Sequence, residues 1–123
     1  MKLNYILVCI ISLLIAACAN DQTADPNSGD CNLPSEVSFA VDIQPIINAS
    51  CAYSGCHGQN GVSGDFTTYD GMLAALDADK IQARVLDAKD MPPTYAPDDK
   101  PKELTNCELD FIQSWVDAGY PNN

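Results

Sequence analysis

The segment CAYSGCH, residues 51–57, constrains this chain more than any other part of the sequence. It brings Cys51 and Cys56 together with His57, which is the only histidine among the 123 residues. A thiol can form a covalent bond, and an imidazole can bind a metal ion. A chain of this length supports one small domain, so that domain has to be built around these three reactive groups.

The histidine follows the second cysteine directly, and covalent attachment of haem requires this order. Each thiol can add across a haem vinyl group to form a thioether, while the adjacent imidazole binds the iron as its proximal ligand. The segment resembles the haem-binding site of c-type cytochromes, in the longer C-x4-C-H form. The resemblance implies one covalent haem c on Cys51, Cys56 and His57. Whether Cys51 reaches its vinyl group depends on an outward bulge, which the small residues Ser54 and Gly55 favour.

Met91, which precedes Pro92 and Pro93, is the candidate for the distal iron ligand. The two prolines stiffen the backbone, so a loop can hold the thioether at a fixed angle. A thioether is a soft ligand that suits haem iron, and in class I cytochromes c, which the chain resembles, a methionine before proline supplies the distal ligand. An ordinary core methionine is the other explanation for Met91. Met72 is the alternative ligand, although the apolar face of its expected helix already accounts for it.

The first 17 residues are predicted to be a signal peptide, because Lys2 precedes an apolar run that is too short for a stable membrane span. The run ends in Leu-Ile-Ala-Ala-Cys, which resembles the lipobox of bacterial lipoproteins and implies cleavage before Cys18 and acylation of that cysteine. An ordinary signal peptide cleaved nearby is the alternative. Residues 18–36 are expected to be the lipidated N-terminus and a flexible tether, since they are mostly small and polar. The chain is therefore expected to be exported and lipid-anchored to the bacterial cell envelope, facing the periplasm or the cell surface.

Acidic residues dominate the composition, with 17 Asp and Glu against 6 Lys and Arg and a formal net charge of −11. This charge argues against binding of nucleic acid and against electrostatic adhesion to anionic lipid. Redox partner proteins with a basic docking face are the expected partners. A merely solvated acidic surface is the simpler alternative.

The other four cysteines also have predicted roles. Cys9 leaves with the signal peptide, and Cys18 takes the lipid. Cys31 and Cys107 remain, and in an oxidising compartment a leftover pair predicts a disulfide. Two free thiols are the alternative.

The resemblance implies an all-α domain over residues 37–123, a small bundle of three to five short helices with long loops around one haem. The residue pattern predicts four helical segments. The first covers residues 43–49 with Asp42 as N-cap, and the second begins in Thr67–Asp70 and carries Met72, Leu73 and Leu76. The third covers residues 80–86, and the fourth begins in the capping box Thr105–Glu108 and ends before Gly119. The last helix contains FIQSWVDAG, residues 111–119. This stretch resembles the last helix of small bacterial cytochromes, where an aromatic residue packs against the N-terminal helix.

The resemblance implies an electron carrier and not an enzyme, because His57 and Met91 would fill both axial positions of the iron. Two alternatives stay open. One is a haem enzyme or gas sensor in which Met91 does not bind and the iron keeps an open position. The other is a haem-free extracellular domain in which Cys51 pairs with Cys56, or in which cysteines and the histidine bind a bare metal ion.

Overall fold

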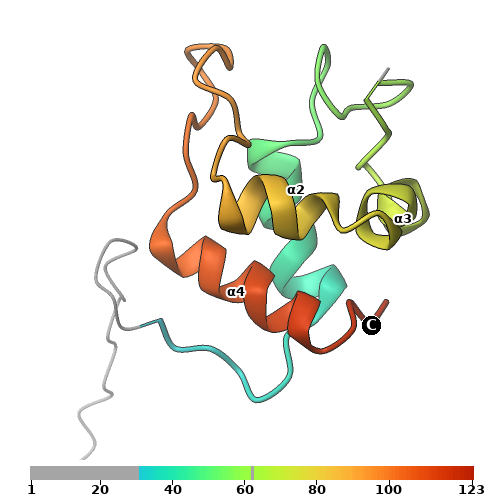
Figure 1. Ribbon diagram of the computed structural model, residues 1–123, viewed down its shortest axis with the longest axis vertical. Coiled ribbons are helices and arrows are strands. Elements are labelled where there is room, and N and C mark those ends of the chain that lie inside the picture. Colours follow the sequence, from blue (N-terminus) through green and yellow to red (C-terminus); the bar gives the residue numbers. More distant parts are fainter. Residues whose placement is uncertain (1–30, 62) are drawn as a thin grey trace, which may run out of the picture.

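The computed structural model describes residues 31–61 and 63–123, which contain helices and no strand. The elements in chain order are the π-helix η1 (Phe39–Ile43), the α-helices α2 (Gln44–Ser50) and α3 (Tyr69–Asp77), the π-helix η2 (Gln82–Asp87) and the α-helix α4 (Asn106–Asp117). Figure 1 shows η1 and α2 as one continuous helical run with α4 crossing its lower part. The prediction of an all-α domain with a few short helices is confirmed at this level.

The first helical run begins earlier than the sequence predicts. Ser38 is the N-cap, so the run starts at Phe39 and not near Ile43. Asp42, the predicted N-cap, lies inside the first turn, and its Oδ2 accepts a hydrogen bond from the Ser38 backbone N–H at 2.8 Å. That prediction was wrong because two side chains that can cap stand close together, and Ser38 takes the cap position while Asp42 reaches back to it. Pro45 is the second residue of α2, as predicted. Because η1 continues directly into α2, Pro45 does not lie in the first turn of the whole helical run.

The middle helices lie where the sequence predicts them. Thr68 caps α3, and its side chain accepts a hydrogen bond from the Gly71 N–H at 3.2 Å. Met72 and Leu76 are the buried residues of this helix. The helical segment that ends in η2 buries Val85 toward the core.

The last helix begins with the predicted capping box. The Thr105 Oγ1 accepts a hydrogen bond from the Glu108 N–H at 3.2 Å, and the Glu108 Oε2 accepts one from the Thr105 N–H at 2.8 Å. Together they satisfy N–H groups that a helix start would leave without partners. The helix ends at Asp117, and Gly119 follows with a φ of 82°.

Trp115 joins the two ends of the domain. Its ring is 0 % exposed and stacks on Phe39 of η1, with ring centroids 5.6 Å apart. Tyr69 and Tyr120 meet the same indole edge-on at 6.5 and 6.2 Å. The indole Nε1 donates a hydrogen bond to the Pro121 carbonyl at 2.9 Å. This is the aromatic contact between the first and last helices that the resemblance implies.

Apart from Ala96, the buried apolar side chains form one cluster that includes Phe39 and Trp115. Val41 does not belong to it, since this side chain is 72 % exposed although it stands in the first apolar run. The cluster consists of Val37, Phe39, Ile43, Ile47, Phe66, Met72, Leu76, Ile81, Val85, Ile112 and Trp115.

Asn123 closes the domain against the start of η1. Its backbone carbonyl accepts hydrogen bonds from the Ala40 N–H and the Ser38 hydroxyl, both at 3.0 Å. Its side chain accepts a bond from the Phe39 N–H at 2.8 Å and donates one to Glu36 at 3.2 Å. The first N–H groups of a helix have no partner inside it, and Asn123 supplies partners for two of them.

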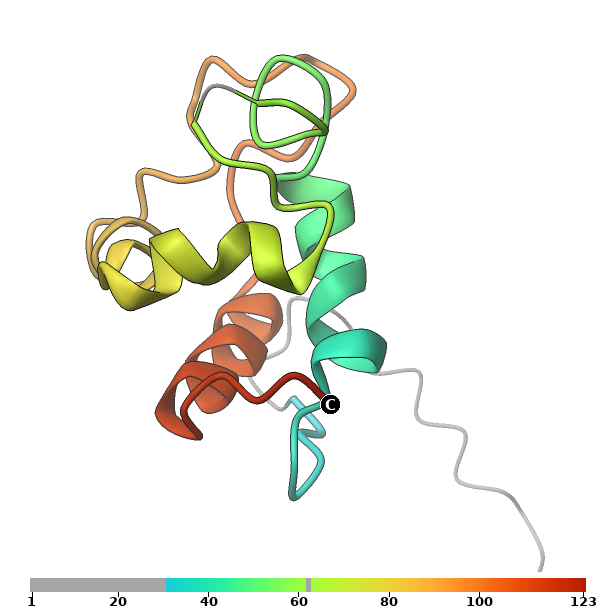
Figure 2. The same cartoon turned by 90° about the vertical axis from the view of Figure 1, so that its right-hand side faces the viewer.

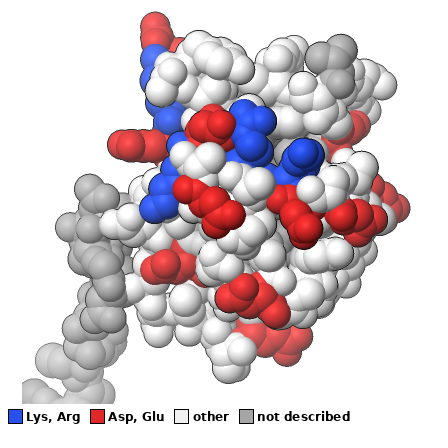
Figure 3. Space-filling view, in the orientation of Figure 1, with Lys and Arg blue, Asp and Glu red and all other residues white. Residues whose placement is uncertain are grey.

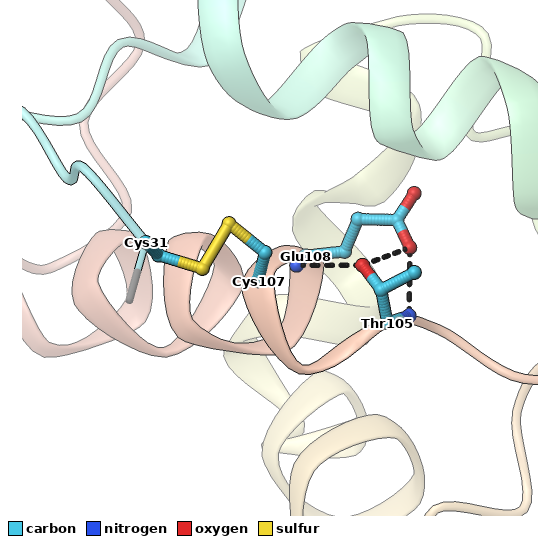
Figure 4. The surroundings of a disulfide bond; sticks show 4 residues. All are labelled: Cys31, Thr105, Cys107 and Glu108. Carbon is cyan, nitrogen blue, oxygen red and sulfur yellow. Dashed lines mark hydrogen bonds between the residues drawn. A yellow bond between two sulfur atoms is a disulfide. The ribbon is translucent and has the colours of Figure 1, made fainter. Parts of the chain in front are cut away.

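The structure joins Cys31 to Cys107 in a disulfide, with Cα atoms 5.4 Å apart (Figure 4). Cys107 lies in the first turn of α4, beside the capping box of Thr105 and Glu108. The bond therefore ties the entry of the domain to its last helix, as the cysteine count predicts.

The expected signal peptide, Cys9, Cys18 and the tether up to residue 30 lie outside the described residues. Within residues 31–61 and 63–123, no helix is both long and apolar enough to cross a membrane.

Candidate functional site

A cavity of about 340 Å³ lies at the end of α2, and four side chains named from the sequence line it: Cys51, Cys56, His57 and Met91. Cys51 follows directly after α2, and Met91 lies in the loop after η2. Most of the wall is apolar, and it includes Ile47, Phe66, Ala75, Ile81, Val85 and Ile112. The volume is within the range of small-molecule and cofactor sites, which are mostly apolar with a few polar groups.

The two methionines considered as ligands differ in position. Met91 is partly buried and lines the cavity. Met72 is 0 % exposed in the core, and it is not among the residues that line the cavity. The structure thus brings Met91, and not Met72, to the cysteines and the histidine.

The loop between the cysteines forms a bulge, which takes up its two additional residues. The backbone N–H groups of Tyr53 and His57 both donate to the Cys51 carbonyl, at 3.0 and 3.2 Å, so the loop leaves and returns at one point. Ser54 and Gly55 between them are exposed. Gly55 has a φ of 88°, which glycine adopts without strain, and a Cβ there would meet no atom within 4 Å. Both thiols therefore reach the same cavity despite the two additional residues.

Gly58 fits tightly against this bulge. Its N–H donates to the Tyr53 carbonyl at 3.0 Å, and a Cβ at Gly58 would lie only 2.6 Å from the Tyr53 carbonyl carbon. A side chain at this position would force the two backbone segments apart. The glycine after the histidine is thus required by close backbone approach.

His57 is held in one tautomer and one ring plane. Its Nδ1 lies 3.1 Å from the Ser63 carbonyl oxygen. Because a carbonyl can only accept, this hydrogen bond requires a proton on Nδ1, so the neutral ring has its lone pair on Nε2. The imidazole also stacks on Phe66, with centroids 4.0 Å apart and planes within 4°. Histidines that bind metals are usually oriented by such a bond from the other ring nitrogen.

The Cys51 thiol is protonated at neutral pH. Burial raises its pKa to about 12, and the neighbouring Cys56 and Glu108 act in the same direction. The protonated thiol keeps the S–H that addition to a carbon–carbon double bond consumes.

Two hydroxyl groups at the cavity have no hydrogen-bond partner. They are the Ser50 Oγ and the Tyr53 Oη, and both are buried. Buried hydroxyls in proteins are normally satisfied, so their presence here fits a cavity that receives another group.

Basic side chains gather near the cavity rim. Lys80 and Arg84 line the cavity, and the Lys100 ammonium lies 5.4 Å from the centre of the Tyr53 ring. Figures 1 and 2 show the loop after α2 and the loop before α4 at the same end of the molecule, which agrees with this contact. Figure 3 shows the Lys and Arg side chains in one part of the face, with acidic side chains spread more widely. Two of these bases form ion pairs, Arg84 with Asp90 and Lys100 with Asp99. Lys102, which does not line the cavity, pairs with Asp98.

The cysteine pairing of the haem-free alternative is not the one that the structure has. Cys51 and Cys56 are free thiols, while Cys31 and Cys107 are bonded to each other. In the described part of the chain, no three His, Cys, Asp or Glu side chains gather into a group that could hold a bare metal ion.

Sequence reasoning missed the residues that orient these groups. Phe66 and the Ser63 carbonyl lie 9 and 6 positions after His57, in a loop whose composition indicates only turns. The Arg84–Asp90 pair precedes Met91, and its spacing of 6 fits no helical rule. A search for aromatic residues shortly after the histidine would have found Phe66, whereas the carbonyl gives no sequence signal.

Comparisons of the chain with protein-family models, with curated proteins and with solved structures find no match. Any functional assignment therefore depends on the chemistry of the cavity and of the residues around it.

Proposed function

We propose that this chain is a monohaem c-type cytochrome that carries single electrons in the bacterial cell envelope. The observation that supports the proposal most is that the candidate haem ligands lie around one cavity. Two free thiols, the only histidine and one of three methionines line one mostly apolar cavity, although Met91 stands 34 positions after His57 in the sequence.

The donor set fits haem better than a bare metal ion. Cys51 and Cys56 would hold the haem through thioether bonds, and both residues line the cavity. His57 would bind the iron through Nε2, because its Nδ1 proton is committed to the Ser63 carbonyl. Met91 would supply the second axial ligand.

Haem bound in this way supplies a one-electron couple at its iron. The apolar side chains of the wall, among them Ile81, Val85 and Ile112, would keep water away from the ring. Such surroundings disfavour the oxidised state, which carries one more positive charge, and a thioether ligand also raises the reduction potential. With His57 and Met91 both bound, no position remains for a substrate, so the residues support transfer of electrons and not catalysis.

The location and the partners follow from the sequence. A lipidated Cys18 would anchor the domain to the cell envelope through a tether, and the signal peptide would direct export. The formal charge of −11 supports redox partner proteins with a basic docking face.

A haem stain after denaturing electrophoresis tests the central claim. The wild-type chain, made in bacteria with working attachment machinery, is expected to keep one haem. The Cys51→Ser and Cys56→Ser single variants are expected to keep haem through one thioether, and the double variant is expected to lose it. A wild-type chain without covalently retained haem would overturn the proposal.

Carbon monoxide separates the carrier from the alternative with an open iron. The reduced wild type is expected to bind the gas weakly, because carbon monoxide has to displace the Met91 thioether. The Met91→Ala variant is expected to bind it readily, as the matched comparison. Equal, rapid binding by both proteins would favour a haem enzyme or gas sensor.

Radiolabelled palmitate tests the lipid anchor. The label is expected on the wild type and not on Cys18→Ser.

A further inference from the structure

The loop that carries Met91 is fastened to η2 by one residue, Arg84. The Arg84 backbone carbonyl accepts hydrogen bonds from the N–H groups of Asp90 and Met91, at 3.0 and 3.3 Å. The Arg84 Nε also donates to both carboxylate oxygens of Asp90, at 2.7 and 2.9 Å. Main chain and side chain of the same residue thus hold Met91 and its immediate neighbour.

The backbone between Arg84 and Met91 makes this contact possible. The π-helix η2 ends at Asp87, and Lys89 adopts a φ of 51°, in the left-handed region. The chain therefore turns back over the last turn of η2. Wide helical turns of this kind are frequent at functional sites. Arg84 and Met91 both line the cavity as a result.

The ion pair is too exposed to be explained by global stability. The two side chains are 49 % and 48 % exposed, and pairs of this kind contribute little to the stability of a whole domain. Its effect is local, because Asp90 is bonded to Met91 through the backbone. A loop opens locally without unfolding the rest of a protein, and contacts at its base limit that opening.

We propose that Arg84 is a positioning residue that holds Met91 in the orientation needed to bind the haem iron, with the Asp90 carboxylate as its partner. This inference rests on the proposed function. The wild type is expected to keep Met91 at the iron, while loss of the pair lets the loop open more often. The usual strength of an exposed ion pair corresponds to about a 1.4- to 5-fold shift between the bound and the released thioether.

The test measures competition for the sixth iron position in the haem-loaded protein. Added imidazole displaces the thioether, and the Met-to-iron charge-transfer absorption reports how much Met91 remains bound. Arg84→Gln and Asp90→Asn are each expected to lower the imidazole concentration at half displacement by about 1.4- to 5-fold. The double variant is expected to show no larger effect than either single one, because the two side chains act as a pair.

Lys102→Gln is the matched control, since it removes the exposed ion pair between Lys102 and Asp98, 3.0 Å long, in another loop. It is expected to leave imidazole displacement unchanged. Urea unfolding of all variants is expected to stay near that of the wild type, which separates positioning from a general loss of structure.

The outcomes distinguish this inference from the proposed function. If Met91→Ala abolishes the charge-transfer absorption while Arg84→Gln and Asp90→Asn bind imidazole like the wild type, the positioning role is wrong and the cytochrome remains. The positioning role is also wrong if Lys102→Gln has the same effect as the other two variants. If the wild type holds no haem, or Met91→Ala leaves the absorption unchanged, the ligand assignment fails and the positioning role fails with it.

Discussion

Removal of the disulfide between Cys31 and Cys107 tests how far the domain depends on a covalent link. The two cysteines stand 76 positions apart, so the bond closes most of the domain into one loop. The chain-entropy relation for a loop of this length gives about 4.5 kcal/mol at 25 °C, because the link restricts the unfolded chain. This value is large beside the roughly 5 to 15 kcal/mol by which small domains are stable.

Part of this loss is offset, because the folded state also gains backbone freedom when the bond is removed. Residues 32–36 are exposed, and the first core residue is Val37. Without the bond, the segment before Val37 gains backbone freedom, and each residue released recovers up to about 1 to 2 kcal/mol before its lost contacts are subtracted. We therefore expect the double variant Cys31→Ser, Cys107→Ser to lose about 2 to 4 kcal/mol.

Urea unfolding of the oxidised wild type and of the double variant measures this loss. With a slope of about 1 to 1.5 kcal/mol per molar, the midpoint is expected to fall by about 1.3 to 4 M. The two single variants are expected to match the double variant, because either change breaks the same bond. Haem retention is expected to stay unchanged, since neither cysteine lines the cavity. An unchanged midpoint, or losses that add between the single variants, would refute the reasoning.

Three further changes test the core, the ligand and the cavity. Trp115→Phe is expected to lower the free energy of unfolding in urea by about 2 to 3 kcal/mol. The change removes the indole hydrogen bond and leaves a void in the core, because the Trp115 side chain is 0 % exposed. Met91→Ala is expected to abolish the Met-to-iron absorption and to lower the reduction potential, while Met72→Leu is expected to leave both unchanged. The opposite result would mean that Met72, and not Met91, is the iron ligand. Replacement of Cys51 and Cys56 by alanine, with residual haem extracted, is expected to lower the urea midpoint by more than loss of the disulfide does. Equal midpoints for the haem-free and haem-loaded proteins would contradict that.

The elements that the sequence locates well are those with local signals. The last helix is capped through Thr105 and Glu108, which stand three positions apart, so the pattern alone places its first residue. The start of the first helical run was harder, because Ser38 and Asp42 both have capping side chains. Asn123 settles that start through bonds to residues more than eighty positions away, which no local pattern contains.

In the candidate site too, some features have a local sequence signal and others depend on the fold. The two thiols and the imidazole are adjacent in the sequence, and their order is informative by itself. Met91 was a candidate because of the prolines that follow it, but its approach to the cavity depends on how η2 and the next loop pack. The hydrogen bond from His57 to the Ser63 carbonyl is invisible in the sequence, because every residue has a carbonyl and only the fold selects one.

The size of the cavity sets how much a bound haem would stabilise this domain under the proposed function. Its wall includes Ile47, Ile81, Val85 and Ile112, which are also members of the core cluster. An empty apolar void of about 340 Å³ would cost up to about 8 kcal/mol at the usual penalty per unit volume, and water in its open part lowers this upper bound. That cost is comparable with the whole stability of a small domain. An apolar ring that fills the space would remove the penalty and bury the surrounding side chains, so in this proposal cofactor binding and folding are one process.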